Sequence, residues 1–177
     1  LATVNSRKCR IGLADQLKAI FSTMAEKRML VATPVFIFLG FTVEFWINVY
    51  PATLIYSKKL EAYGNLQAYY IIAVGLGEIS MGAIISVLSK YINNFAKMPA
   101  MIIGFILYFT AMTMALLSTP YEAIHTPTDA PTLLLEPSMH LSLVIAFMLG
   151  MTDSAFVTSR TVLCSQLIPE KISHVFS

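Results

Sequence analysis

Four long apolar runs dominate the sequence, and charged side chains are rare within them. They cover residues 29–56, 67–89, 98–119 and 139–168. An α-helix rises about 1.5 Å per residue, so about 20 apolar residues cross the hydrocarbon core of a bilayer. Each run is long enough for this. The pattern therefore predicts an all-α membrane protein with about four transmembrane helices.

Proline and charged residues mark the ends of these runs. A charged cluster at 26–28 precedes the first run, and Pro51 near its far end predicts a kink or an end of the helix there. Pro99 falls in the first turn of the third helix, where its missing N–H costs least. Four prolines between residues 119 and 138 predict a loop before the last helix.

The segment before the first run has an amphipathic pattern. Apolar residues recur at helical spacing within residues 12–28, at Leu13, Leu17, Ile20, Phe21 and Met24. This predicts a short helix at the membrane surface, within a linker domain of residues 1–28 that precedes a bundle of residues 29–177. A helix dedicated to binding a partner is the alternative.

Basic residues are unevenly distributed between the loops. With a cytoplasmic N-terminus, nine Lys and Arg side chains face the cytoplasm and only Lys58 and Lys59 face the other side. Lys and Arg collect in cytoplasmic loops of membrane proteins. The pattern therefore predicts that both ends of the chain are cytoplasmic and that the acidic loop 119–138 is extracytoplasmic. The sequence does not name the organelle.

Composition excludes several other classes of protein. Of the 177 residues, 56% are apolar and 12% are charged, and the formal net charge is +2. A disordered chain would be more charged and poorer in aromatic residues, and a nucleic-acid partner would require more Lys and Arg. Two cysteines, Cys9 and Cys164, are too few for a disulfide framework. The expected surroundings are the lipid bilayer.

Four ionisable residues lie at membrane depth, namely Glu44, Glu78, Asp153 and Arg160. A charge in mid-bilayer costs about 2.5–3.5 kcal/mol on insertion scales, so these side chains should face the bundle interior or a water-filled cavity. One interpretation is a proton or cation site. The other is an internal network of hydrogen bonds and salt bridges that orients the helices.

Spacing places some of these residues together. Asn48 follows Glu44 by four residues, so the two share a helix face. Asp153 and Arg160 also share a face, but a rise of about 10.5 Å separates them, which is too far for a direct ion pair. Trp46, two residues after Glu44, is expected in an aromatic belt at the membrane interface.

Glycines within the spans predict close contacts between helices. Small residues let two helix backbones approach each other. The candidates for such packing are Gly75, Gly77, Gly82 and Gly150.

The sequence gives no sign of an enzyme. It contains no nucleophile elbow, P-loop or metalloprotease helix, and no pair of its three histidines has metal-ligand spacing on one helix. We therefore expect no catalytic residue, no metal and no cofactor. Cys164 is expected to be a small packing residue.

Three segments carry motifs. Residues 41–51 read Phe-Thr-Val-Glu-Phe-Trp-Ile-Asn-Val-Tyr-Pro, residues 74–79 hold a Gly-x-Gly-Glu core followed by Gly82, and residues 149–158 read Leu-Gly-x-x-Asp-Ser-x-x-x-Thr. In this order and spacing, they resemble the seventh, eighth and tenth spans of UNC-93-like proteins, a branch of the major facilitator superfamily.

The resemblance implies a fragment from the C-terminal half of a major facilitator fold. A full member has 12 spans in two halves. The four runs would be its spans seven to ten, and the amphipathic segment would match its central cytoplasmic linker. The missing N-terminal half would then be a partner of this chain.

The same resemblance leaves three hypotheses for function. The first is a regulatory or trafficking subunit that binds an ion channel or a receptor. The second is a proton- or cation-coupled secondary transporter, in which Glu44, Glu78 and Asp153 line a central cavity. The third is a bundle whose charges only fix packing. Fold alone does not decide between them.

Overall fold

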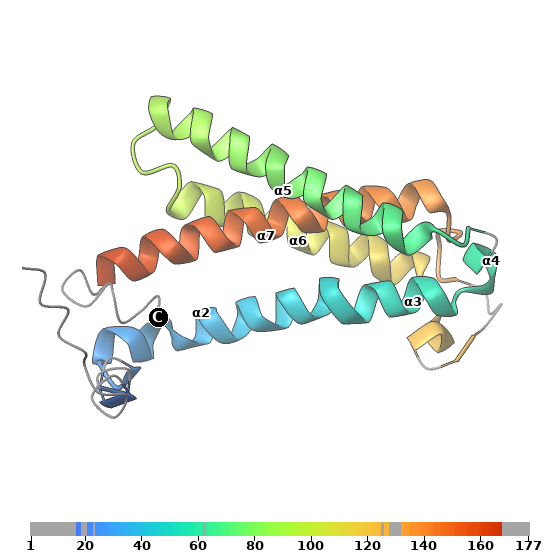
Figure 1. Cartoon of the computed structure of the whole chain (residues 1–177), viewed down its shortest axis with the longest axis horizontal. Helices are drawn as coiled ribbons and strands as arrows, with labels where there is room; N and C mark the ends of the chain where they lie inside the picture. Colours follow the sequence, from blue (N-terminus) through green and yellow to red (C-terminus); the bar gives the residue numbers. More distant parts are fainter. Residues whose placement is uncertain are drawn as a thin grey trace, which may run out of the picture.

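Four membrane-length helices make up most of the described chain (Figure 1). The computed structural model describes residues 17–18, 21–22, 24–61, 63–124, 126–127 and 132–167. Within these ranges no strand occurs. The helices that are long and apolar enough to cross a membrane are Met29–Tyr56, Leu66–Tyr91, Met98–Ser118 and Met139–Gln166. The predicted all-α membrane fold is thus confirmed.

The first of these spans is built from three segments. An α-helix, α2 (Lys27–Glu44), leads into one turn of π-helix, η1 (Phe45–Val49), and then into α3 (Tyr50–Tyr56). Pro51 lies in the first turn of α3, where its lack of an N–H costs least, so the helix does not end there. The predicted irregularity at Pro51 is present, but it takes the form of the π-turn that precedes the proline.

The other spans are single helices. These are α5 (Leu66–Tyr91), α6 (Met98–Ser118) and α7 (Met139–Leu167), and two short helices, α4 (Lys58–Glu61) and the 3₁₀ helix η2 (Tyr121–Ile124), lie between spans. We call the end where α2 and α6 begin and where α5 and α7 finish the basic end. It carries Lys27, Lys90 and Lys97.

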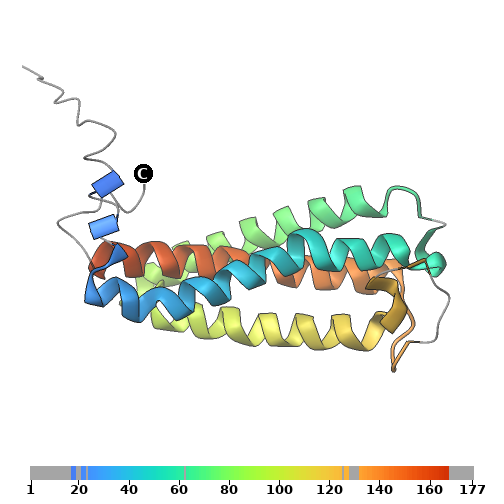
Figure 2. The same ribbon diagram turned by 90° about the horizontal axis from the view of Figure 1, so that it is seen from below.

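One helix, α7, is the common neighbour of the other three (Figures 1 and 2). Both α5 and α6 pack along α7, and α2 touches it over a shorter stretch, whereas α5 and α6 make few contacts with each other. Ile145, Ala146 and Leu149 of α7 are completely buried. Because lipid is as apolar as a leucine side chain, close packing of this kind is what holds membrane helices together.

Aromatic rings attach α2 to this central helix. The ring of Phe38 on α2 lies 5.1 Å from Phe105 and 5.7 Å from Tyr108, both on α6, and 6.1 Å from Phe156 on α7. Ring pairs at these distances attract each other beyond the area they bury. Phe38 therefore links the first span to both α6 and α7.

Several predicted features lie outside the described residues. The amphipathic segment 12–28 is described only in part, and Cys9 and residues 168–177 are not described. The loop 119–138 contains η2 and also includes undescribed positions.

Candidate functional site

The carboxylates of Glu78 on α5 and Asp153 on α7 both lie near the seam between these two helices. Both side chains are half-buried, and their charges lie within electrostatic reach of each other. The seam exists because the two helix backbones nearly touch just beside it. The two carboxylates thus come from different helices and lie beside the same helix contact.

Trp46 approaches the same seam from η1. Its indole N–H is buried and has no hydrogen-bond partner among the described residues, although it lies beside the Asp153 carboxylate. A buried donor without an acceptor costs about 1–3 kcal/mol. The Trp46 indole N–H thus lies next to the Asp153 carboxylate without forming a hydrogen bond to it. The expected place of Trp46 in an interfacial belt is wrong, because its side chain packs inward.

The π-turn explains how Trp46 is placed. In η1 the Tyr50 N–H donates to the Phe45 carbonyl, five residues earlier, instead of to Trp46. The next possible backbone donor to the Trp46 carbonyl is Pro51, which has no N–H. The Tyr70 hydroxyl of α5 supplies the missing bond at 2.6 Å. Such π-turns are frequent at functional sites.

Glu44 and Asn48 make a second, separate polar pair. The Asn48 side-chain amide donates to the Glu44 carboxylate at 2.8 Å, and both residues are exposed on the outside of the four helices. Thr42, two residues before Glu44, is buried, and helix positions two apart point in nearly opposite directions. Glu44 therefore lies on the outer surface of the four described helices and not between them.

Arg160 is also exposed, which again differs from the prediction. It lies on α7 near the basic end, and no ion pair joins it to Asp153 or to any other residue in the described ranges. A long Arg side chain near a helix end extends toward the membrane interface, which removes the need for a buried partner.

The predicted packing glycines differ in how closely they approach the neighbouring helix. A Cβ atom on Gly77 of α5 would lie 2.9 Å from the Met151 amide nitrogen and closer still to the Phe147 carbonyl of α7. A Cβ on Gly150 would likewise collide with the Val74 backbone of α5. The two glycines therefore form one reciprocal contact between the backbones.

The other two glycines predicted to pack against a helix, Gly82 and Gly75, differ in their surroundings. A Cβ on Gly82 would lie 3.7 Å from the Ser154 hydroxyl, which is an ordinary contact. Gly75 has nothing within 4 Å of that position among the described residues, so its predicted packing role is wrong here. It lies two residues from Gly77 and so faces away from α7.

Sequence reasoning missed two contact residues. Gly104 of α6 lies against α7, since a Cβ there would be 2.9 Å from the Phe156 ring. The Ser159 hydroxyl of α7 bonds to the Ala96 and Lys97 carbonyls at 3.3 and 3.2 Å. A glycine in an apolar run was a signal for the first. A serine in a span gave no comparable signal.

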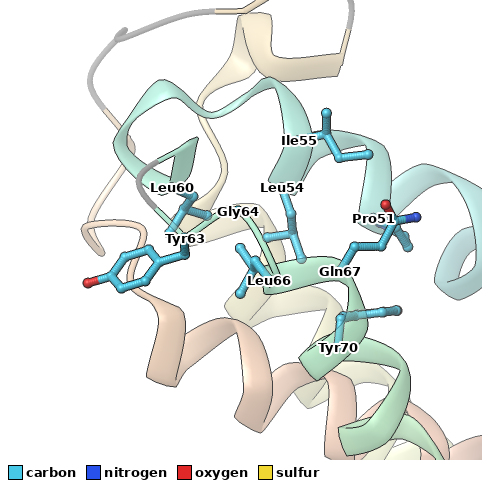
Figure 3. Close-up of a pocket in the computed structure, with 9 residues that line it drawn as sticks. All are labelled: Pro51, Leu54, Ile55, Leu60, Tyr63, Gly64, Leu66, Gln67 and Tyr70. Atoms are coloured by element: carbon cyan, nitrogen blue, oxygen red, sulfur yellow. The ribbon is translucent and has the colours of Figure 1, made fainter.

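The described residues include a free cysteine and several surface grooves. In the described ranges, no group of three or more His, Cys, Asp and Glu side chains could hold a metal ion, and Cys164 is a buried free thiol. A groove of about 290 Å³ lies at the end opposite the basic end, and none of the ionisable candidates lines it. Figure 3 shows its lining by residues of α3, α4 and the start of α5, such as Leu54, Leu60 and Tyr70.

Comparison with known proteins gives a consistent result. Residues 2–177 match the profile of the family described as "Ion channel regulatory protein UNC-93". The chain is 28% identical over 178 residues to "UNC93-like protein MFSD11" of Xenopus tropicalis, and 26% identical over 182 residues to the protein of that name in Xenopus laevis. Each alignment covers 99% of this chain and 40% of the relative's length. No solved structure matches the chain significantly.

Proposed function

Because this chain belongs to the UNC-93 family, we propose that it is part of a non-enzymatic membrane subunit that binds an ion channel or a receptor and regulates or escorts it. The family description carries this proposal. The chain spans about 40% of the length of the curated relatives that it matches. We therefore propose the activity for the intact protein, with residues 29–177 supplying spans seven to ten and residues 1–28 the cytoplasmic linker.

The positions of the polar residues support binding over transport. A transporter of this design would bring Glu44, Glu78 and Asp153 to one cavity. Instead, Glu44 points away from the α5–α7 seam and pairs with Asn48 on the exposed surface. A polar pair on an exposed, otherwise apolar face suits a hydrogen bond to a helix of another membrane protein or of the other half of the fold.

Quantitative co-purification of the intact protein tests this proposal. We expect a channel or receptor to co-purify at about one copy per chain in mild detergent, and the amount to fall when Glu44 and Asn48 are both replaced by Ala. Thr113→Ala is the control, because this exposed threonine bonds only to the Phe109 carbonyl of its own helix. A monodisperse protein without a stoichiometric partner would contradict the proposal.

Secondary transport is the second candidate, and the Glu78–Asp153 pair beside the unpaired Trp46 indole favours it. Paired carboxylates between membrane helices are typical of proton relays. Proton-linked flux in proteoliposomes should then be lost with Glu78→Gln and with Asp153→Asn. Flux that survives neutralisation of Glu44, Glu78 and Asp153 together would rule this candidate out.

A further inference from the structure

A crevice at the basic end separates α2 from α7. Its volume is about 70 Å³, and it lies between α2, the start of α6 and the last turns of α7. Its floor is apolar and includes Leu39, Met101 and Phe156. We call it the inner crevice.

The rim of the inner crevice is positively charged. Lys97 and Arg160 both line it and no acidic side chain does, although Asp153 lines a neighbouring crevice together with Arg160. Neither cation forms an ion pair with any residue for which the structure gives a position. The rim therefore has two positive charges that an anion from outside the protein could neutralise.

Both cations belong to residues near the ends of membrane spans at the basic end. Lys97 immediately precedes α6, and Arg160 lies six residues before Gln166, the last residue of its span. Six helical residues correspond to a rise of about 9 Å, so Arg160 lies within two helical turns of the end of its span.

Ser159 holds the rim in place. Its hydroxyl donates to the Ala96 and Lys97 carbonyls, so the loop before α6 is fixed beside the turn of α7 that carries Arg160. A fixed pair of cations above an apolar slot between helices matches an anionic phospholipid, whose headgroup would sit on the rim and whose acyl chain would follow the floor.

We propose that the inner crevice is a binding site for an anionic phospholipid of the leaflet at the basic end, with Lys97 and Arg160 contacting the headgroup phosphate. This inference does not depend on whether the protein regulates a partner or transports a substrate. It requires only the geometry of α2, α6 and α7.

Lipid titration of the intact, delipidated protein tests the proposal. Native mass spectrometry in detergent would compare phosphatidylserine with phosphatidylcholine of the same acyl chains. We expect the protein to prefer phosphatidylserine, and the preference to shrink as salt is raised, because screening weakens the contact with exposed charges. Equal binding of the two lipids, or a preference that salt does not change, would overturn the proposal.

Variants identify the site. Each basic residue near a membrane surface contributes about fivefold in affinity, so Lys97→Gln combined with Arg160→Gln should weaken phosphatidylserine binding about 25-fold. Lys59→Gln combined with Lys90→Gln also removes two positive charges, but at positions away from the crevice. This double variant should change phosphatidylserine binding little. An equal loss of phosphatidylserine binding in both double variants would mean that binding depends on the overall charge of the protein and not on the inner crevice.

A third variant tests the proposal in case the Lys97 and Arg160 double variant does not fold. Leu163→Trp keeps both cations and fills the crevice, which Leu163 lines. It should lower phosphatidylserine binding several-fold. Unchanged binding would overturn the proposal, as would a span of the intact protein that already occupies the crevice, which would leave no bound lipid to detect.

Discussion

The hydroxyl of Tyr70 on α5 donates a hydrogen bond of 2.6 Å to the backbone carbonyl of Trp46 on η1. This bond joins the first two spans at the turn where the backbone register changes. It also supplies a donor to a carbonyl that has lost its own because of the π-turn and Pro51. The π-turn therefore depends on a side chain from the next helix.

Tyr70→Phe tests this dependence. The substitution leaves the Trp46 carbonyl without a donor in an apolar environment, which should cost about 1 kcal/mol, or about 2–4 °C in melting temperature. Tyr69→Phe is the control, because Tyr69 is exposed on the same helix. Thermal unfolding in detergent measures both. Equal melting temperatures for the two variants would show that the bond does not support the turn.

Gly77→Ala and Gly150→Ala should each destabilise the contact between α5 and α7. An added methyl group at either position meets the backbone of the facing helix, which cannot move aside as a flexible side chain would. Overpacking of this kind costs about 1–3 kcal/mol. Gly75→Ala, with nothing nearby, should be neutral or stabilising because alanine favours the helix. A loss of melting temperature in all three variants would contradict this interpretation.

Phe38→Ala should loosen the first span from the rest of the bundle. The substitution removes three ring contacts with α6 and α7, at a cost of at least about 1 kcal/mol. Hydrogen exchange of the α2 amides should accelerate. Phe41→Ala, which removes a ring that is 70% exposed, is the matched control and should leave exchange unchanged. Faster exchange in the control alone would contradict the assignment.

Ser159→Ala should detach the loop before α6. The serine makes two bonds to loop carbonyls, and their loss should cost about 0.5–1.5 kcal/mol. A cysteine introduced as Phe95→Cys, at a buried loop position, should then react faster with a thiol reagent. Thr161→Ala removes a bond within α7 only and serves as the control. An unchanged thiol reaction rate in Ser159→Ala would argue against the anchoring role.

Thiol labelling also tests the proposed orientation. In a protein whose native cysteines are replaced, Tyr91→Cys and Glu136→Cys place thiols at exposed positions on the two ends of the bundle. In sealed vesicles whose cytoplasmic face is outward, a reagent that cannot cross the membrane should label Tyr91→Cys, and Glu136→Cys only after the vesicles are opened. The reverse labelling pattern would show that the protein has the opposite orientation in the membrane.

The sequence predicts the spans well because a bilayer imposes a minimum length of apolar helix. It also predicts that Glu44 and Asn48 lie together, since a separation of four residues places two side chains on one face of any α-helix. Both predictions depend on features within a single helix. They need no knowledge of its neighbours.

The arrangement between helices could not be predicted in the same way. The spans are apolar on all sides, so hydrophobic periodicity does not mark an inner face. Gly75 and Gly77 look equivalent in the sequence, yet only Gly77 meets α7. The direction of Glu44, the approach of Trp46 to Asp153 and the π-turn all depend on which helix lies opposite.

The central position of α7 also has a consequence for biosynthesis. The ribosome makes α7 after the other described spans, and α5 and α6 have few contacts with each other in its absence. At about 5–20 residues per second, the earlier spans wait in the membrane for several seconds before their common neighbour emerges. A nascent chain that stalls before Met139 would leave α5 and α6 in the membrane without the helix against which both of them pack.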